Sequence, residues 1–268
     1  FPLDRFLQDL DELWRRGARR YKFVDRTFNL RVETSAAILD FFLQRMASTP
    51  NDLPFLHFEM IPDHLPQDLR GRLARFPAGT LQLEIGIQTF NAEVQALISR
   101  RQKNDAAQAN LRWLRAETCA HLHVALIAGL PGEDLASLAA GFDRLVALGP
   151  HEIQLGTLKR LRGAPIARHS KGHAMKFGAE APYEVISTDL IDAPTMQRIR
   201  RFARYWDLIA NSGRFPRALA AVVGARPFEC FMALSDWLYA TTQRTHALPL
   251  EELYARLHVW MVRQGMTA

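Results

Sequence analysis

The stretch that decides the fold is LQLEIGIQTFNAEVQALISRRQ, residues 81–102. Its first eight residues alternate between an apolar and a polar set, and the apolar set is Leu81, Leu83, Ile85 and Ile87. A period of two predicts a strand whose two faces meet different surroundings. Asn91 is a suitable cap for a helix that follows directly. A strand that leads into a helix in this way predicts a parallel βα unit.

The same strand-then-helix pattern recurs through the first 160 residues. Strands are expected at 21–25, 55–60, 81–88, 121–128 and 152–158. Helical patterns are expected between them at 35–46, 65–75, 92–116 and 135–148. This alternation favours a parallel sheet covered by helices.

The second face of these strands is polar. His57 and Glu59 share one face of their strand, and so do His121 and His123. An open, doubly wound sheet buries both faces and would give continuous apolar runs instead. We therefore expect an α/β fold, a partial (β/α) barrel of parallel strands, with apolar side chains toward the helices and polar side chains toward a concave interior that serves as a reaction chamber.

The repetition stops after residue 158. Residues 159–177 are rich in Arg, Lys, Gly and His, and a loop of this length is often a functional lid or a mobile segment. A short strand is expected at 183–187 and helices from residue 193 onward. We divide the chain into a partial barrel, 1–178, and a mainly helical C-terminal domain, 179–268. The apolar core expected in the second part comprises Trp206, Phe228, Phe231, Trp237, Leu253, Leu257 and Trp260.

The chain has 268 residues, a formal net charge of +6 and a pI near 9.7. This balance suits an anionic ligand or nucleic acid without choosing between them. Many of the cations are arginines of one C-terminal segment: Arg198, Arg200, Arg201, Arg204, Arg214 and Arg217. An apolar stripe runs through the same segment, so we expect the arginines to line a solvated helix face. A nucleic-acid surface is the alternative.

Cysteine usage and hydropathy exclude some classes of protein. Cys119 and Cys230 are too few for a disulfide framework or a metal site, and we expect them to be buried thiols. No apolar run reaches the roughly 18 residues that span a membrane, so a cytoplasmic protein is expected. The first readable element, 1–17, is a helix, with Leu10 and Leu13 among the residues of its apolar face. Because a βα architecture should open on a strand, we expect the preceding strand to belong to a longer parent protein.

Four segments together resemble radical S-adenosylmethionine (radical SAM) enzymes, particularly those with an N-terminal cobalamin-binding domain. GIQTFNAEVQALISR resembles the fourth barrel strand and its helix, in which an arginine follows a glutamine by twelve residues; here 100 − 88 = 12. ALIAGLPGED, 125–134, resembles the fifth strand and its glycine turn. FEMIPD, 58–63, and FVDRTFN, 23–29, resemble the third and second strands.

The resemblance implies a binding site for SAM at the carboxyl ends of the strands. Glu59 would accept hydrogen bonds from the ribose, Arg100 would pair with the SAM carboxylate, and glycines would let the backbone approach adenine. The implied cofactor-binding residues are Asp25, Arg26, Asn29, Glu59, Gln88, Arg100, Gly129 and Gly132. A [4Fe–4S] cluster and cobalamin are implied as further cofactors, both held outside this chain.

Two features depart from the family pattern. The C-x3-C-x2-C run that holds the cluster is absent, and we expect its cysteines upstream of Phe1. Ala125 stands where the oxygen-independent coproporphyrinogen oxidase branch has an aspartate, which argues against membership of that branch.

The implied activity belongs to the full-length parent: reductive cleavage of SAM to a 5′-deoxyadenosyl radical that acts on an unknown substrate. The fragment itself is expected to be inactive. The implied partners are the substrate, the N-terminal part of the same protein and an electron donor, without a membrane. Two alternatives are a catalytically inactive barrel scaffold and an RNA-modifying or RNA-binding protein. The histidines of the polar faces receive no catalytic role.

Overall fold

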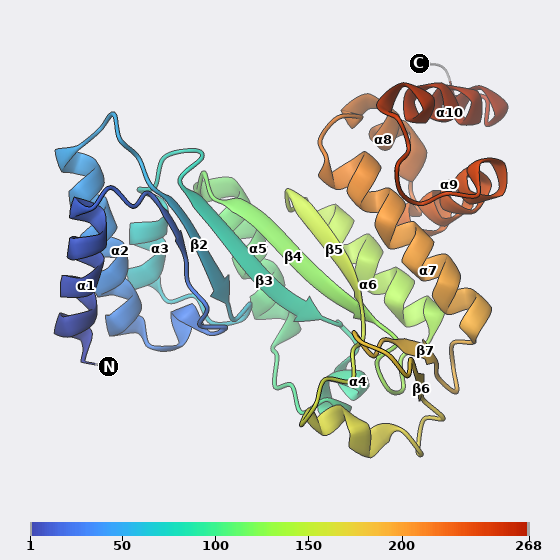
Figure 1. The fold of residues 1–268 in the computed structure, drawn as a ribbon, viewed down its shortest axis with the longest axis horizontal. Coiled ribbons are helices and arrows are strands. Elements are labelled where there is room, and N and C mark those ends of the chain that lie inside the picture. The colour runs from blue at the N-terminus through green and yellow to red at the C-terminus, as the bar shows by residue number, and fades with distance from the viewer. Residues whose placement is uncertain (1, 267–268) are drawn as a thin grey trace. The chain divides into compact units, whose positions relative to one another are not determined.

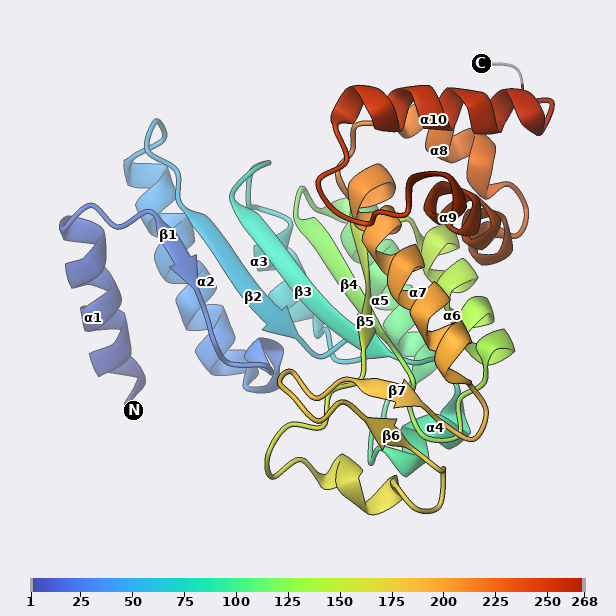
Figure 2. The ribbon, with the colours of Figure 1, turned by 45° about the vertical axis from the view of Figure 1, so that its right-hand side comes forward.

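The centre of the fold is a five-stranded sheet with the strand order β1-β2-β3-β4-β5. The structure, a computed structural model, describes residues 2–266. The strands are β1 (Arg20–Lys22), β2 (Phe55–Met60), β3 (Leu81–Gln88), β4 (His121–Ala128) and β5 (Glu152–Thr157). β1 pairs with β2, and β2 with β3, in parallel, and Figure 2 shows these three strands in this order. The predicted α/β class, with a helical C-terminal region, is confirmed.

The residues form two compact units, which we describe separately. Unit 1 comprises residues 1–87, 102–125 and 148–151, and unit 2 comprises residues 88–101, 126–147 and 152–268. The domain boundary placed after residue 178 from the sequence stays a prediction.

Unit 1 contains β1, β2, most of β3 and their helices. These helices are α1 (Leu3–Arg15), α2 (Val32–Ser48), α3 (Gln67–Leu73), α5 (Asn104–Glu117) and the short η1 (Phe28–Leu30). Aromatic rings fill its core: Phe28 stacks on Phe58 with centroids 3.8 Å apart, Phe23 lies 4.5 Å from Phe58, and Tyr21 lies 5.0 Å from Phe42. These rings join β1, η1, α2 and β2 into one apolar layer.

The first helix, α1, packs beside α2, as Figure 2 shows. Leu10 and Trp14 are its buried residues. Leu13 was expected on the same apolar face but is 45% exposed. The prediction was wrong there because the large Trp14 side chain, four residues after Leu10, takes the inward position.

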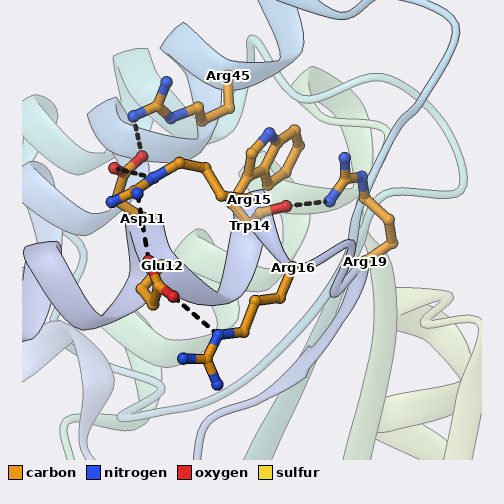
Figure 3. A network of polar contacts seen from close by, with 7 residues as sticks. All are labelled: Asp11, Glu12, Trp14, Arg15, Arg16, Arg19 and Arg45. Carbon is orange, nitrogen blue, oxygen red and sulfur yellow. Dashed lines mark hydrogen bonds and ion pairs between the residues drawn. The ribbon is translucent and has the colours of Figure 1, made fainter.

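Charged side chains join α1 to the rest of unit 1 (Figure 3). Asp11 accepts hydrogen bonds from Arg15, at 3.0 Å, and from Arg45 of α2. The Arg19 guanidinium lies 4.0 Å from the centroid of the Trp14 ring and donates to the Trp14 carbonyl oxygen at 2.9 Å. Exposed pairs of this kind contribute about 0–1 kcal/mol each. They orient α1, while the apolar core supplies most of the stability.

Unit 2 contains the rest of the sheet, the loop segment and the C-terminal helices. Its elements are α4 (Ala92–Leu97), α6 (Leu135–Leu148), η2 (Pro165–His169), β6 (Lys176–Phe177), β7 (Val185–Ser187), α7 (Ala193–Trp206), η3 (Asp207–Asn211), α8 (Pro216–Val223), α9 (Pro227–Thr242) and α10 (Leu250–Arg263). Figure 1 shows α7 running beside β5, which it contacts. Five rings, from α6, α7 and α9, form the core of this unit: Phe142, Phe202, Trp206, Phe228 and Phe231. Trp237 and Trp260, also expected in the core, are half-buried.

The helix expected over 92–116 is two helices, α4 and α5, separated by residues 98–103. Ser99 has a φ of 58°, in the left-handed region. Its N–H donates to the Ala96 carbonyl oxygen at 3.1 Å, and the Arg100 N–H donates to the Gln95 carbonyl oxygen at 2.8 Å. This pair of bonds is a Schellman motif, which ends a helix. The prediction failed because the sequence has no glycine at the terminating position.

A side chain covers the backbone of the edge strand β5. The Ile153 N–H donates to Oδ1 of Asn211 at 3.0 Å, and Nδ2 of Asn211 donates to the Ile153 carbonyl oxygen at 3.0 Å. The amide of Asn211 therefore satisfies the ladder groups that an edge strand leaves open.

Within residues 2–266 no single helix is long and apolar enough to cross a membrane. The pair α8 and α9, with an angle of 112° between them, has the length and composition of a span when the two helices are taken together.

Candidate functional site

The polar face of unit 1 follows the pairing of β2 with β3. His57 lies opposite Gln82, and Glu59 lies opposite Glu84. His57 Nε2 is 3.0 Å from Oε2 of Glu84, and His57 is 9% exposed. Glu59 is half-buried, and its carboxylate has no hydrogen-bond or ion-pair partner among residues 2–266. An unpaired carboxylate beside another acid is available to accept hydrogen bonds from a ligand.

Asp25 and Arg26 lie in the exposed loop after β1. Asp25 Oδ1 accepts hydrogen bonds from the backbone N–H of Thr27, at 2.9 Å, and from its hydroxyl, at 3.0 Å. These bonds form a local turn. The second carboxylate oxygen of Asp25 and the Arg26 guanidinium are left for a ligand. The role of both residues in binding SAM stays a prediction.

Asn29 is different, because it is fully buried. Its Nδ2 donates to the carbonyl oxygens of Ile61, at 2.8 Å, and His64, and its Oδ1 accepts from the Ile61 N–H at 2.7 Å. Both amide N–H donors are therefore used within the protein. These contacts fix the loop that follows β2 and Glu59, which makes Asn29 a positioning residue in this structure.

In unit 2, Gln88 ends β3 in an unusual backbone conformation. Its φ is 68°, in the left-handed region, where a residue other than glycine costs about 1 kcal/mol or more. Its side-chain Oε1 is buried and has no hydrogen-bond partner. Strained backbone together with an unsatisfied buried acceptor is typical of a binding site.

The residues after Gln88 form a buried polar network that sequence reasoning missed. Thr89 Oγ1 donates to Glu133 Oε1 at 2.5 Å, and Ser137 Oγ lies 3.4 Å from the same oxygen. Asn91 Nδ2 donates to Ser137 Oγ at 3.0 Å, and Gln95 Nε2 donates to the Thr89 carbonyl oxygen at 2.8 Å. The network ties the end of β3 to the start of α6. Asn91 also accepts from the backbone N–H groups of α4, which confirms its predicted capping role.

Glu133 is the ionisable member of this network and is 1% exposed. Burial raises its pKa to about 7, against lowering by the hydrogen bonds from Thr89 and Ser137, and the neighbouring Asp134 raises it further. Oε2 of Glu133 is buried without a partner. The signal in the sequence is an acid in the otherwise apolar and glycine-rich turn 125–134.

Gly129 and Gly132 meet protein atoms. A Cβ on Gly129 would lie 2.4 Å from Val185 Cγ1 and 3.3 Å from Met196 Cε. A Cβ on Gly132 would lie 2.9 Å from Leu97 Cδ1. Both glycines have positive φ, 82° and 76°. Backbone conformation and close packing account for glycine here, and the predicted approach of adenine stays a prediction.

Arg100, the other predicted residue of this unit, is half-buried in the turn after α4.

The two cysteines are not the buried thiols that we expected. Cys119 is exposed, just before β4, and Cys230 is half-buried in α9. The prediction followed the usual burial of cysteine, but both positions fall outside the apolar layers. Among residues 2–266 no group of three or more His, Cys, Asp or Glu side chains could hold a metal ion.

The C-terminal arginines are not a simple solvated face. Arg198 makes a bidentate ion pair with Asp236, with Nη2 to Oδ2 at 2.6 Å. Arg200 donates to the Val185 carbonyl oxygen at 2.6 Å, and the Arg201 guanidinium lies 4.1 Å from the centroid of the Tyr239 ring. These three arginines serve contacts within unit 2. The nucleic-acid alternative stays a prediction.

Solved structures of two radical SAM enzymes have a similar fold. A radical S-adenosylmethionine methyltransferase, TsrM, from Kitasatospora setae, with tryptophan substrate and a SAM analogue bound, superposes on 68% of the chain with a TM-score of 0.56 at 16% identity. The cobalamin-dependent S-adenosylmethionine radical enzyme OxsB superposes on 98% of the chain with a TM-score of 0.58 at 13% identity. The chain has the α/β fold of radical SAM enzymes. It covers 36% of the TsrM chain and 46% of the OxsB chain.

Two curated relatives match part of this chain in sequence. The chain is 29% identical over 97 residues to the oxygen-independent coproporphyrinogen III oxidase of Paracoccus denitrificans, and 35% identical over 77 residues to that of Cereibacter sphaeroides. It spans 21% and 17% of the length of these curated relatives. Residues 171–267 match a family described as a protein of unknown function, DUF4080.

Proposed function

We propose that this chain is part of a radical SAM enzyme whose full-length form binds SAM at the carboxyl ends of the parallel strands. The observation that carries the proposal is Gln88. It ends β3 with a φ of 68° and a buried, unsatisfied amide oxygen, at the position where the sequence resembles the family's glutamine. Ligands of parallel α/β folds bind at this end of the strands.

The chain's own residues fit the polar groups of SAM. The unpartnered carboxylate of Glu59 suits the ribose hydroxyls, the amide of Gln88 both donates and accepts, and the Arg100 guanidinium suits a carboxylate. In unit 1, Asp25 and Arg26 have exposed polar groups that suit a polar ligand, and Asn29 positions the loop after Glu59. We assign catalysis to none of these residues, because they bind and orient.

We further propose that the ligands of the [4Fe–4S] cluster, and cobalamin if it is used, come from a part of the parent protein outside this sequence. Bound SAM and the cluster would supply a substrate radical, and the protein would hold the substrate and exclude water. The parent would also need an electron donor. The substrate and the cytoplasmic location stay predictions.

The test is SAM binding by the anaerobically reconstituted parent, measured by equilibrium dialysis. Gln88→Gly tolerates the left-handed backbone and removes the side chain together with its amide. We expect it to weaken SAM binding by about tenfold, the effect of one strong hydrogen bond. The control is Gln243→Gly at the end of α9, another glutamine with positive φ, 53°. Equal affinity of Gln88→Gly and the natural protein would remove Gln88 from the site.

The rival hypothesis of a catalytically inactive scaffold makes a separate prediction. A scaffold would bind no SAM after reconstitution, in either variant. The RNA-binding alternative predicts salt-dependent RNA affinity that is lost when Arg198, Arg201 and Arg204 are neutralised.

A further inference from the structure

The segment between β5 and β7 carries an unusual concentration of positive charge. Residues 159–179 contain six Lys and Arg and no Asp or Glu. We call residues 159–177 the cationic cap. Its cations are Lys159, Arg160, Arg162, Arg168, Lys171 and Lys176.

The cationic cap is built on defined contacts. Nη2 of Arg168 donates to the Leu97 carbonyl oxygen at 3.1 Å and to Ser99 Oγ at 2.7 Å. Nε of Arg168 donates to His169 Nε2 at 2.9 Å. Met175 is buried, and its N–H donates to the Ser170 carbonyl oxygen at 2.9 Å. Arg168 thus anchors the cap to the turn after α4, and the buried Met175 closes a turn within the cap.

A second anchor lies at His173. Its Nδ1 is 3.5 Å from Asp189 Oδ2, and the Asp189 N–H donates to the His173 carbonyl oxygen at 2.9 Å. His173 Cε1 is 3.6 Å from the position of a Cβ on Gly132. The cap therefore lies against two turns that carry predicted SAM-binding residues, Arg100 in one and Gly132 in the other.

The remaining cations have no counter-charge. Lys159, Arg162, Lys171 and Lys176 are exposed, and none has an ion-pair partner within residues 2–266. Of the acids that follow the cap in sequence, Glu184 lies 3.5 Å from Arg200 and Asp189 lies beside His173, while Glu180 is exposed and forms no ion pair with the cap within residues 2–266. Like charges held on one short segment repel each other, and an anion that binds them relieves this repulsion.

We propose that the cationic cap binds the substrate, and that the substrate is a small molecule with two or more carboxylate or phosphate groups. The claim that the bound anion is the substrate rests on the proposed function. The claim that the cap binds anions does not rest on it, because it concerns the cap alone. Nucleic acid is the less favoured ligand because three of the C-terminal arginines that would extend such a surface are occupied within unit 2.

The test is isothermal titration of this chain, without SAM or cluster, with pyrophosphate and with citrate as the two probes. The variant is Lys171→Gln with Lys176→Gln. The matched control, Arg214→Gln with Arg217→Gln, removes the same charge from exposed positions of the same unit. We expect the cap variant to weaken binding by about tenfold, with the control within twofold of the natural chain. The probe that binds tighter identifies phosphate or carboxylate as the preferred group.

The inference would be overturned if neither probe bound, or if the cap variant and the control weakened binding equally. It would also be overturned if a single-stranded RNA displaced both probes and bound more tightly, with an affinity that falls steeply as salt is added. SAM binding by the parent is measured separately. Its failure with intact anion binding would remove the proposed function and leave the anion-binding cap.

Discussion

Glu133 should make the protein less stable as the pH rises through the slightly acidic range. Burial raises its pKa from 4.5 to about 7, so the native state keeps a proton that the unfolded state has released between these values. A native state that binds more protons loses stability as the pH rises. The stability contributed by the neutral carboxyl is complete below pH 4.5 and is lost by pH 7 and above.

The size of the effect follows from the shift. A rise in the pKa from 4.5 to about 7 corresponds to about 3 kcal/mol at about 1.36 kcal/mol per pKa unit. Between pH 5 and pH 8 the part of this stability that is lost is about 2–3 kcal/mol. Glu133→Gln cannot ionise and removes this dependence, while its amide oxygen still accepts the hydrogen bond from Thr89.

The assay is urea unfolding of both proteins at pH 5 and pH 8, followed by tryptophan fluorescence. We expect the stability of the natural chain relative to Glu133→Gln to fall by about 2–3 kcal/mol between the two pH values. Glu180→Gln, at an exposed position of unit 2, is the control and should keep the pH dependence of the natural chain. A difference between natural chain and Glu133→Gln that does not change with pH would refute the reasoning and show that Glu133 is solvated.

Three further changes test how the structure is held together. Asn29→Ala should cost about 3 kcal/mol in the free energy of unfolding, because it leaves buried backbone groups of the loop after β2 unpaired, whereas a loss below 1 kcal/mol would show that water replaces the side chain. Asn211→Ala should speed hydrogen exchange at the Ile153 amide at least tenfold, because the edge of β5 loses its cover; unchanged exchange would contradict that role. Gln243→Gly should raise stability by about 0.5–1 kcal/mol, because glycine relieves the left-handed strain at the end of α9, and Gln243→Ala should not.

The alternation of apolar and polar residues was sufficient to predict most of the sheet. β2, β3 and β4 have the predicted bounds, because each has one face fully buried and one face partly open, which fixes the period. Trp206 of α7 and Phe228 and Phe231 of α9 were correctly predicted as core residues, whereas the buried Phe202 was not predicted and Trp237 is half-buried. α4 and α5 were merged because Ser99 ends α4 without the glycine that usually marks such an end.

The candidate site was predictable only where a motif carried it. Gln88 and Arg100 were predicted from the resemblance to a family motif, but nothing in the sequence shows that Gln88 has positive φ. Glu133 was missed, because its importance comes from burial between the end of β3 and the start of α6, and the two segments are 44 residues apart in sequence. Asn29 was recognised as a site residue, but its internal hydrogen bonds depend on the loop after β2, which no local pattern predicts.

The central claim is that the parent protein is a radical SAM enzyme. Its most direct test is to reconstitute the full-length protein anaerobically with iron and sulfide, reduce it, add SAM and measure 5′-deoxyadenosine beside the electron paramagnetic resonance spectrum. We expect a reduced cluster signal that SAM perturbs, with formation of 5′-deoxyadenosine that Glu59→Ala and Arg100→Ala both weaken. A protein that assembles no cluster, or a cluster that SAM does not affect, would contradict the account.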